Sequence, residues 1–154
     1  MEFVLHAYCG LYCGACPILL QTRAGEGEKR CQGCKSGVNA DYCAICAVKA
    51  CAAQKGIAFC GECGELEGCA LMAKFAADTT WLNQRGVLAN LETIRRAGLT
   101  HWLGEQDRRW RCAACGRAYS WWDETCPECG QPVISCQAEI KAREGKWTSL
   151  SKLW

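Results

Sequence analysis

The chain has 154 residues, and 16 of them are cysteine, a share of about one tenth that is far above ordinary globular usage. This length allows one domain or two small ones, and small domains often depend on disulfides or metal ions for stability. So much cysteine leaves two classes, secreted disulfide-bonded proteins and intracellular metal-binding proteins. The net charge of +2 is too small to indicate a nucleic-acid partner.

The N-terminal residues favour the intracellular class. MEFVLHAYCG has an acidic second residue and a three-residue apolar run, whereas a signal peptide needs a basic start and roughly 7–15 apolar residues. No stretch reaches the roughly 18 apolar residues of a membrane span. We therefore expect a cytoplasmic protein with no membrane partner, in which clustered cysteines stay reduced and bind metal.

Cysteine spacing divides the chain. Eleven cysteines lie from Cys9 to Cys69, four more from Cys112 to Cys129, and Cys136 follows. We predict a cysteine-rich metal-binding module over residues 1–80, a helical connector over 81–106, a zinc ribbon over 107–135 and a tail with helical spacing over 136–154. The predicted fold class is a small metal-stapled α+β protein, in which knuckles and short helices precede a linking helix and a rubredoxin-like zinc-ribbon hairpin.

The first motif, CGLYCGAC at residues 9–16, has the C-x3-C-x2-C spacing with which radical-SAM enzymes hold a [4Fe–4S] cluster. Those enzymes need roughly 200 residues of alternating strands and helices. Here further cysteines follow, without the glycine-rich segments that contact SAM, so the scaffold argues against radical-SAM chemistry. A cluster on Cys9, Cys13, Cys16 and a fourth thiol stays an alternative to zinc.

Spacing alone groups eight of the N-terminal cysteines into two four-thiol sites. The first, at C-x2-C-x14-C-x2-C, comprises Cys13, Cys16, Cys31 and Cys34. The second, at C-x2-C-x13-C-x2-C, comprises Cys43, Cys46, Cys60 and Cys63. Two residues between thiols let both sulfur atoms reach one ion about 2.3 Å away. The second grouping is not unique, because Cys51 or Cys69 could take the place of Cys43.

Three stretches have helical patterns. Pro17 suits the first position of a short helix through ILLQTRA. In CALMAKFAAD one helical face would carry Leu71, Met72, Phe75 and Ala76. In GVLANLETIRRAG the apolar stripe is Leu88, Leu91 and Ile94. Gly98 follows that last stretch as a helix-ending glycine would.

The strongest motif is CAACGRAYSWWDETCPECG, with the spacing C-x2-C-x10-C-x2-C. Its thiols are Cys112, Cys115, Cys126 and Cys129. Gly116 and Gly130 follow the two pairs and permit turns that aim N–H groups at the thiolates. The aromatic residues between the pairs predict a hairpin that joins the two knuckles. Closed four-thiolate sites usually hold zinc in a structural role, so we expect zinc here.

Aromatic and basic residues gather near this motif. Six of the seven tryptophans lie beyond residue 100, and Trp147 and Trp154 share a helical face with Leu150 in the tail. These tryptophans either form a small core or expose a stacking surface for single-stranded nucleic acid or a peptide. Arg108, Arg109 and Arg111 would assist the second role. His6 and His101 are the only histidines, and each is expected at an ordinary structural position rather than as a ligand.

The segments CGLYCGACP, CQGCKS and CAVKACAAQKGIAFCGECGELEGC resemble a cysteine-rich family called domain of unknown function 3795, over roughly residues 8–77. The continuation NLETIRRAGLTHWL…RWRCAACG is similar to longer family members with an appended C-terminal ribbon. The resemblance implies a metal-binding fold and no particular reaction. It also implies that Cys46 pairs with Cys51, which leaves Cys43 and Cys136 as extras.

These observations predict fourteen metal ligands and roughly two to four zinc ions, with a [4Fe–4S] cluster in the N-terminal module as the alternative. The ligands are Cys9, Cys13, Cys16, Cys31, Cys34, Cys46, Cys51, Cys60, Cys63, Cys69, Cys112, Cys115, Cys126 and Cys129. Nucleotide-binding and hydrolase motifs are absent, so we expect a non-enzymatic protein that binds another protein. The alternatives are an iron–sulfur or redox protein, and a single-stranded nucleic-acid binder that uses the ribbon.

Overall fold

The computed structural model describes the backbone of residues 2–151 and the side chains of residues 2–144. Helices dominate, and strand pairing in the described chain is confined to three isolated bridges. The α-helices are α1 (Pro17–Ala24), α2 (Asp41–Ala44), α3 (Ala47–Lys55), α4 (Ala70–Ala76), α5 (Val87–Ala97), α6 (Leu99–Arg109) and α7 (Cys136–Ser151). The 3-10 helices are η1 (Cys13–Ala15), η2 (Cys60–Glu62), η3 (Leu66–Gly68) and η4 (Leu82–Gly86).

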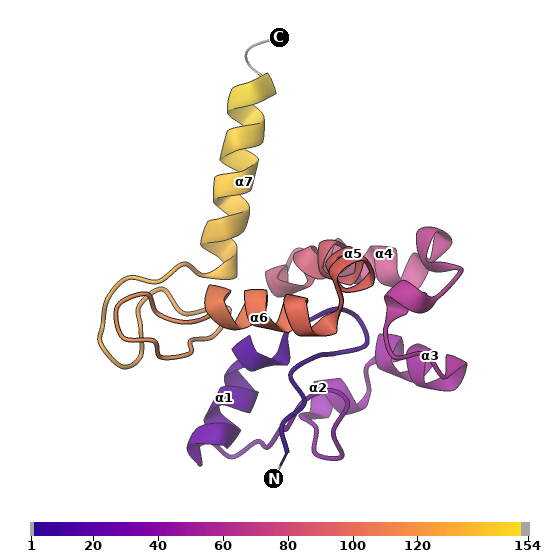
Figure 1. Cartoon of the computed structure of the whole chain (residues 1–154), viewed down its shortest axis with the longest axis horizontal. Coiled ribbons are helices and arrows are strands. Elements are labelled where there is room, and N and C mark those ends of the chain that lie inside the picture. Colours follow the sequence, from indigo (N-terminus) through magenta and orange to yellow (C-terminus); the bar gives the residue numbers. More distant parts are fainter. Residues whose placement is uncertain (1, 152–154) are drawn as a thin grey trace.

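One core joins the cysteine-rich N-terminal part to the helices that follow it. Figure 1 shows α5 and α6 in the middle of the molecule, with α1 and α2 on one side of them. The largest fully buried side chains come from four helices and are Leu19, Met72, Val87, Leu91 and Trp102. Trp102 contacts the ring of Tyr12 edge-on, at 6.1 Å between centroids. Residues 81–106 therefore contribute to the core that covers the N-terminal cysteines.

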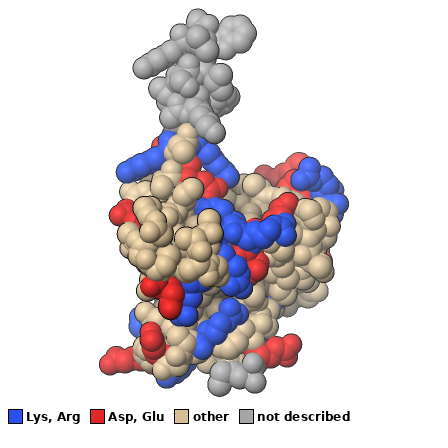
Figure 2. Space-filling view, turned by 60° about the vertical axis from the view of Figure 1, so that its left-hand side comes forward, with Lys and Arg blue, Asp and Glu red and all other residues tan. Residues whose placement is uncertain are grey.

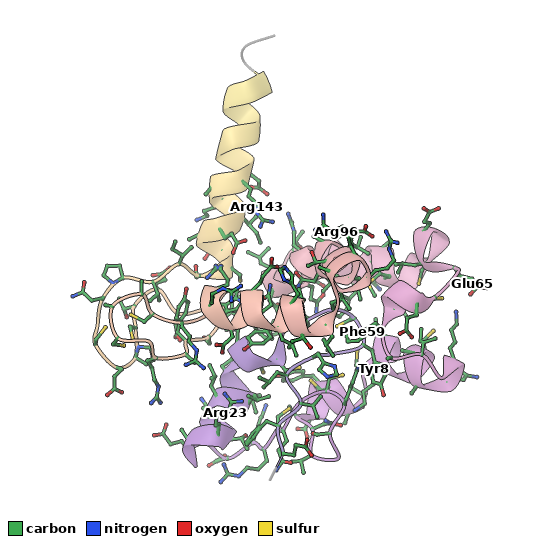
Figure 3. All side chains as sticks on the ribbon, viewed as in Figure 1. Tyr8, Arg23, Phe59, Glu65, Arg96 and Arg143 are labelled. Carbon is green, nitrogen blue, oxygen red and sulfur yellow. The ribbon has the colours of Figure 1, made fainter. Side chains whose placement is uncertain are left out.

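The loop that carries Cys34 and the loop that carries Cys60 meet near Tyr8 and Phe59, which lie together in Figure 3. The Cys60 N–H donates to the Tyr8 carbonyl over 2.8 Å. The Lys35 ammonium lies over both rings, 3.8 Å from the Phe59 centroid and 4.8 Å from that of Tyr8. This cation–π contact fixes the loop that carries Cys34 against the loop that carries Cys60.

The predicted helices form, but two of their faces are rotated. Pro17 begins α1, and Gly98 ends α5 with φ of 92°. Leu88 was expected on the buried stripe of α5 and is 45% exposed, whereas Val87 is fully buried. Leu71 of α4 is likewise exposed. In α5 the buried residues are Val87 and Leu91, and Ile94 packs against the core. Their spacings of four and then three residues follow the helical period of 3.6 more closely than the repeated three-residue spacing of Leu88, Leu91 and Ile94.

The expected hairpin between the two C-terminal knuckles does not form in the described chain. One isolated bridge closes each knuckle, Arg111 with Ala118 and Thr125 with Pro132, and no ladder links the two. The residues between them pack on the N-terminal part instead: the Trp121 N–H donates to the Ala15 carbonyl over 3.1 Å. Burial of the large indole there outweighs the pairing that a short two-stranded ribbon would give.

The tail forms the helix α7, which projects away from the rest of the molecule (Figure 1). Its start is fixed, because the Cys136 N–H donates to the Trp121 carbonyl over 2.8 Å and Arg109 pairs with Glu139 at 2.6 Å. The predicted apolar face of Trp147, Leu150 and Trp154 lies outside the described side chains. No helix in the described part of the chain combines the length and apolar character needed to cross a membrane.

Candidate metal centres

Two turns of the same shape carry the C-terminal cysteines. In each turn a glycine N–H donates to the carbonyl of the first cysteine, from Gly116 to Cys112 over 2.8 Å and from Gly130 to Cys126 over 3.0 Å. Both glycines have positive φ, 78° and 75°, which glycine adopts without the strain that a Cβ would cause. The glycines predicted to permit these turns therefore do so.

The four C-terminal sulfur atoms form one compact group. The Sγ atoms of Cys112 and Cys129 are 3.6 Å apart, and those of Cys115 and Cys126 are 3.5 Å apart. All four lie within 4.8 Å of one another. Tetrahedral coordination with bonds of about 2.3 Å requires sulfur separations of about 3.8 Å, so these residues fit a single ion. This group could bind a metal ion, and a four-cysteine set of this kind accommodates zinc or iron.

Backbone N–H groups favour the thiolate form that binds metal. The N–H of Cys129 donates to the Cys126 sulfur and lowers the pKa of that thiol to about 7. The N–H of Glu128 acts in the same direction. Cys112 and Cys126 are buried, whereas Cys115 and Cys129 are exposed. One side of the group therefore faces the protein, and the other is open to solvent for metal entry.

A first N-terminal group gathers around η1. Cys9, Cys13, Cys16, Cys31 and Cys34 are all buried. The Cys34 N–H donates to the Cys13 sulfur, although burial still raises the pKa of Cys13 to about 12. The pKa of Cys13 is raised further by the charges of Cys34, Cys16 and Cys31. The four thiols of the first set predicted from spacing are therefore near one another. Cys43, which the family pattern left as an extra, shares a hydrogen bond with Cys31 and lowers the pKa of Cys31 to about 5.

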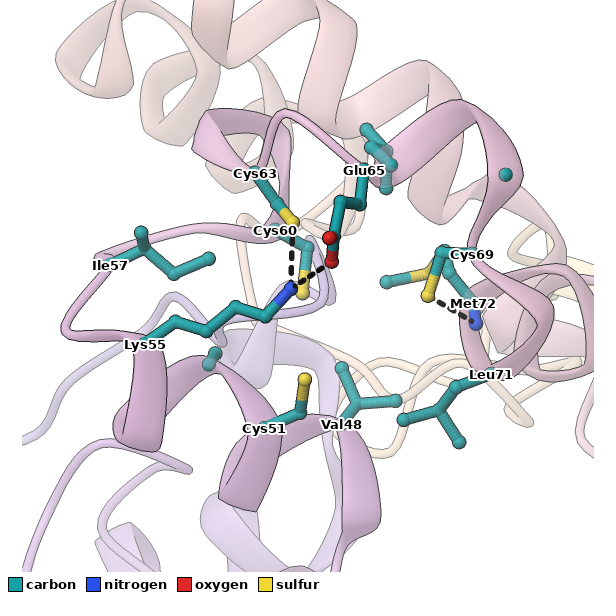
Figure 4. Close-up of a pocket in the computed structure, with 13 residues that line it drawn as sticks. Val48, Cys51, Lys55, Ile57, Cys60, Cys63, Glu65, Cys69, Leu71 and Met72 are labelled. Atoms are coloured by element: carbon teal, nitrogen blue, oxygen red, sulfur yellow. Dashed lines mark hydrogen bonds and ion pairs between the residues drawn. The ribbon is translucent and has the colours of Figure 1, made fainter.

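A second N-terminal group lines a pocket between α3, η2 and α4. Its cysteines are Cys51, Cys60, Cys63 and Cys69. Figure 4 shows their sulfur atoms around the space that these elements enclose. Spacing had offered Cys51 or Cys69 in place of Cys43, and the structure places both beside Cys60. Besides burial, the charge of Cys46 raises the pKa of Cys9 and Cys34 in the first group and of Cys60 in the second. Cys46 is therefore close to both groups.

The pocket contains two charged residues that the sequence did not single out. Lys55 donates to the Cys63 sulfur over 3.2 Å and pairs with Glu65 at 2.8 Å. The hydrogen bond from Lys55 lowers the pKa of Glu65, and Glu65 together with Cys63 raises the pKa of Lys55. For Lys55 the sequence contains one indication of this position: it follows Cys51 by four residues and therefore shares its face of α3.

The N-terminal groups differ from the C-terminal one in compactness. Within the described part of the chain, Cys112, Cys115, Cys126 and Cys129 are the only set of three or more His, Cys, Asp or Glu side chains whose ligand atoms all lie within 4.8 Å of one another. The ligand roles of the ten predicted N-terminal cysteines stay predictions. Cys136 is buried in the core at the start of α7.

Comparison with known proteins bears on the N-terminal part. Residues 5–74 match the model of a family described as Protein of unknown function (DUF3795). The DUF3795 match contains both N-terminal cysteine groups and supports the resemblance seen in the sequence, whereas the C-terminal four-cysteine group lies beyond it. No curated protein and no solved structure matches the chain.

The remaining candidate residues have structural contacts. Trp102, Trp110 and Trp121 are buried, as the core interpretation predicts. Arg109 binds Glu139, Tyr119 and the Ile134 carbonyl, and Arg111 pairs with Asp107. Figure 2 shows basic side chains interspersed with acidic ones on one face of the molecule. His101 pairs with Glu105 one helical turn away.

Proposed function

We propose that this chain is a non-enzymatic zinc protein that recognises another protein, with zinc bound by Cys112, Cys115, Cys126 and Cys129. The observation that carries the proposal is the compactness of these four thiols, which lie within 4.8 Å of one another. Four protein ligands fill the tetrahedral shell of zinc and leave no position for a substrate, which is the arrangement of structural sites.

The ion would fix the chain on both sides of two neighbouring tryptophans. Trp121 is buried between the knuckles, and its backbone binds Ala15 and Cys136. Trp122, the next residue, faces outward and is 37% exposed. Its ring centroid is 6.3 Å from that of Trp81, which is 55% exposed. Zinc binding would therefore hold an exposed pair of indoles in one orientation.

This indole pair is the recognition surface that we propose. Tryptophan is enriched where proteins meet, because its large apolar ring and its N–H group can both be satisfied by a partner. The two residues come from distant parts of the sequence, and η4 and the knuckle segment hold them together. Nucleic-acid binding is less well supported, because Arg109 and Arg111 already have partners within the chain.

The test is affinity purification with the full, zinc-loaded chain, followed by binding measurements with each purified candidate partner. We expect a partner whose affinity falls at least tenfold in Trp81→Ser and in Trp122→Ser, since truncating a hot-spot residue of an interface costs about 2 kcal/mol or more and tenfold corresponds to about 1.4 kcal/mol. Tyr42→Ser is the matched control, because Tyr42 is a similarly exposed aromatic residue elsewhere on the surface. If no specific partner is found, or if all three variants bind as the wild type does, the proposed role is wrong.

A further inference from the structure

The pocket lined by the second N-terminal cysteine group is a feature that the zinc proposal does not use. It has a volume of about 470 Å³. Its four cysteines come from three elements: Cys51 from α3, Cys60 and Cys63 from the two ends of the η2 turn, and Cys69 from the start of α4. Their sequence spacing is C-x8-C-x2-C-x5-C.

The sulfur atoms surround a space rather than meeting at a point. A single tetrahedral ion requires sulfur separations of about 3.8 Å, as found at the C-terminal site. Among the described residues, no three thiols of the pocket approach one another as closely as those do. A [4Fe–4S] cluster has a different requirement, because each of its four cysteine ligands binds a different iron atom at a separate corner.

The walls of the pocket also suit a cluster. They carry the aliphatic side chains of Val48, Ile57, Leu66, Leu71 and Met72. Val48 and Met72 are buried and keep water from the inner side of the pocket, and limited access of water is one of the ways in which proteins tune iron–sulfur centres. The free volume between these side chains is what a group larger than one ion needs.

Hydrogen bonds reach two of the four sulfur atoms. The Met72 N–H donates to the Cys69 sulfur over 3.4 Å, and the Lys55 ammonium donates to the Cys63 sulfur over 3.2 Å (Figure 4). Four thiolates give a cluster a net negative charge, and Lys55, which also pairs with Glu65 at 2.8 Å, places an N–H donor against one ligand sulfur. Hydrogen bonds to the sulfur atoms stabilise the additional negative charge of the reduced cluster and so raise its reduction potential.

From this arrangement we propose that Cys51, Cys60, Cys63 and Cys69 bind one [4Fe–4S] cluster in the pocket. The assignment differs from the cluster suggested by the C-x3-C-x2-C motif, whose thiols lie in the first group around η1. It is independent of zinc at the C-terminal site. The chain would then hold a structural ion at one end and a cluster at the other.

The test uses the full chain purified anaerobically and reconstituted with sulfide and equal amounts of ferrous and ferric iron. We expect about four iron and four sulfide per chain, with a brown absorption that bleaches on reduction. Cys60→Ser and Cys69→Ser should lose most of this iron. Cys43→Ser is the matched control and should keep it, because Cys43 is a half-buried thiol outside the pocket.

Two results would overturn the assignment. One is zinc or no metal in the pocket after reconstitution of the wild-type chain. The other is loss of iron in Cys13→Ser with retention in Cys60→Ser, which would place the cluster in the first group. Because cysteine variants can fail to fold, Lys55→Gln provides a second measurement. The cluster should remain with a more negative reduction potential, and an unchanged potential would contradict a cluster beside Cys63.

Discussion

At the scale of single residues, backbone constraints place the sulfur atoms of the first N-terminal group. Gly33 lies between Cys31 and Cys34 and has φ of 115°, a conformation that L residues rarely adopt. Its N–H donates to the Cys31 sulfur over 3.4 Å. A Cβ at this position would collide with the carbonyl oxygen of Val4. The close approach of these two chain segments therefore requires glycine.

Gly33→Ala should destabilise the chain by roughly 1–3 kcal/mol or more, because the strained backbone and the collision with Val4 add together. Urea unfolding of the metal-loaded protein measures the change. Gly37→Ala is the matched control, since Gly37 has no neighbouring atom within 4 Å of an added Cβ and should change stability little. Equal stability of the two variants would show that the loop can move away from Val4.

His6 should make stability depend on pH. Burial, and then the charge of Lys35, lower the pKa of His6 below 6.5, and its buried Nδ1 has no hydrogen-bond partner among the described residues. The unfolded chain therefore binds the proton more readily. The contribution of His6 to stability is complete above about pH 6.5 and declines as the pH falls below that value.

We therefore expect the free energy of unfolding to fall more between about pH 7.5 and pH 5.5 in the wild type than in His6→Phe. Phenylalanine keeps the ring that packs against Phe59 at 5.4 Å and removes the titrating group. Urea unfolding at matched pH measures both chains, and thiol protonation cancels in the comparison. Identical pH slopes would mean that His6 does not contribute.

At the scale of elements, the helix α5 packs against separate cysteine-bearing segments of the N-terminal part. The Leu91 side chain fills the space beside Gly10, where an added Cβ would come within 3.0 Å of it, and it also lies next to Gly61 of η2, so one side chain lies beside the loop that carries Cys9 and the loop that carries Cys60. The Asn90 amide donates to the Gly10 carbonyl over 2.9 Å. α5 therefore holds the loops that carry the N-terminal thiols.

Leu91→Ala should cost about 2–5 kcal/mol, the range for truncating a buried leucine, because the residue is 2% exposed. Leu88→Ala, on the same helix with the same chemical change, should cost less than about 1 kcal/mol because its side chain is 45% exposed. Thermal or urea unfolding of the two variants gives the comparison. A larger loss in Leu88→Ala would mean that the stripe expected from the sequence is the buried one.

Sequence patterns predicted the elements with local causes. Pro17 and Gly98 mark helix ends through their own backbone preferences, and the spacing of the C-terminal cysteines gives a compact group because the ligands lie in two short turns. The patterns failed where distant contacts decide. The knuckles form no hairpin because Trp121 binds Ala15, more than one hundred residues away in the chain.

The N-terminal thiols show the same limit. Their spacing predicts one four-thiol site from Cys13, Cys16, Cys31 and Cys34, and the structure places the other three near enough to Cys13 to act on it electrostatically, while the metal site itself stays a prediction. The spacing could not decide which thiols accompany Cys60. That choice depends on how α3 and α4 pack around η2, which places Cys51 and Cys69 at the pocket and brings Lys55 to Cys63.

At the scale of the whole molecule, the C-terminal four-cysteine group and the N-terminal part are connected through Trp121. Its N–H binds the Ala15 carbonyl next to Cys16, and its carbonyl accepts the Cys136 N–H at the start of α7. Loss of the ion would free the two knuckles that flank Trp121. The effect should therefore extend to η1 and to the start of α7.

Cys129→Ser should consequently raise the rate of hydrogen exchange in residues 111–135 and also in residues 8–16, which contain no substitution. Glu128→Ala is the control, because it alters the exposed neighbour of Cys129 and leaves every thiol in place. Hydrogen-exchange mass spectrometry reports both segments at once. Faster exchange limited to residues 111–135 would show that the C-terminal site is uncoupled from the N-terminal part.

The most direct measurement of the central claim is the zinc content of the anaerobically purified chain and of its Cys115→Ser/Cys129→Ser variant. These two thiols are the exposed members of the group, so their replacement disturbs the core least. We predict that the wild type holds one more zinc ion per chain than the variant. Equal zinc in the two proteins, or iron in place of zinc at this site, would contradict the account.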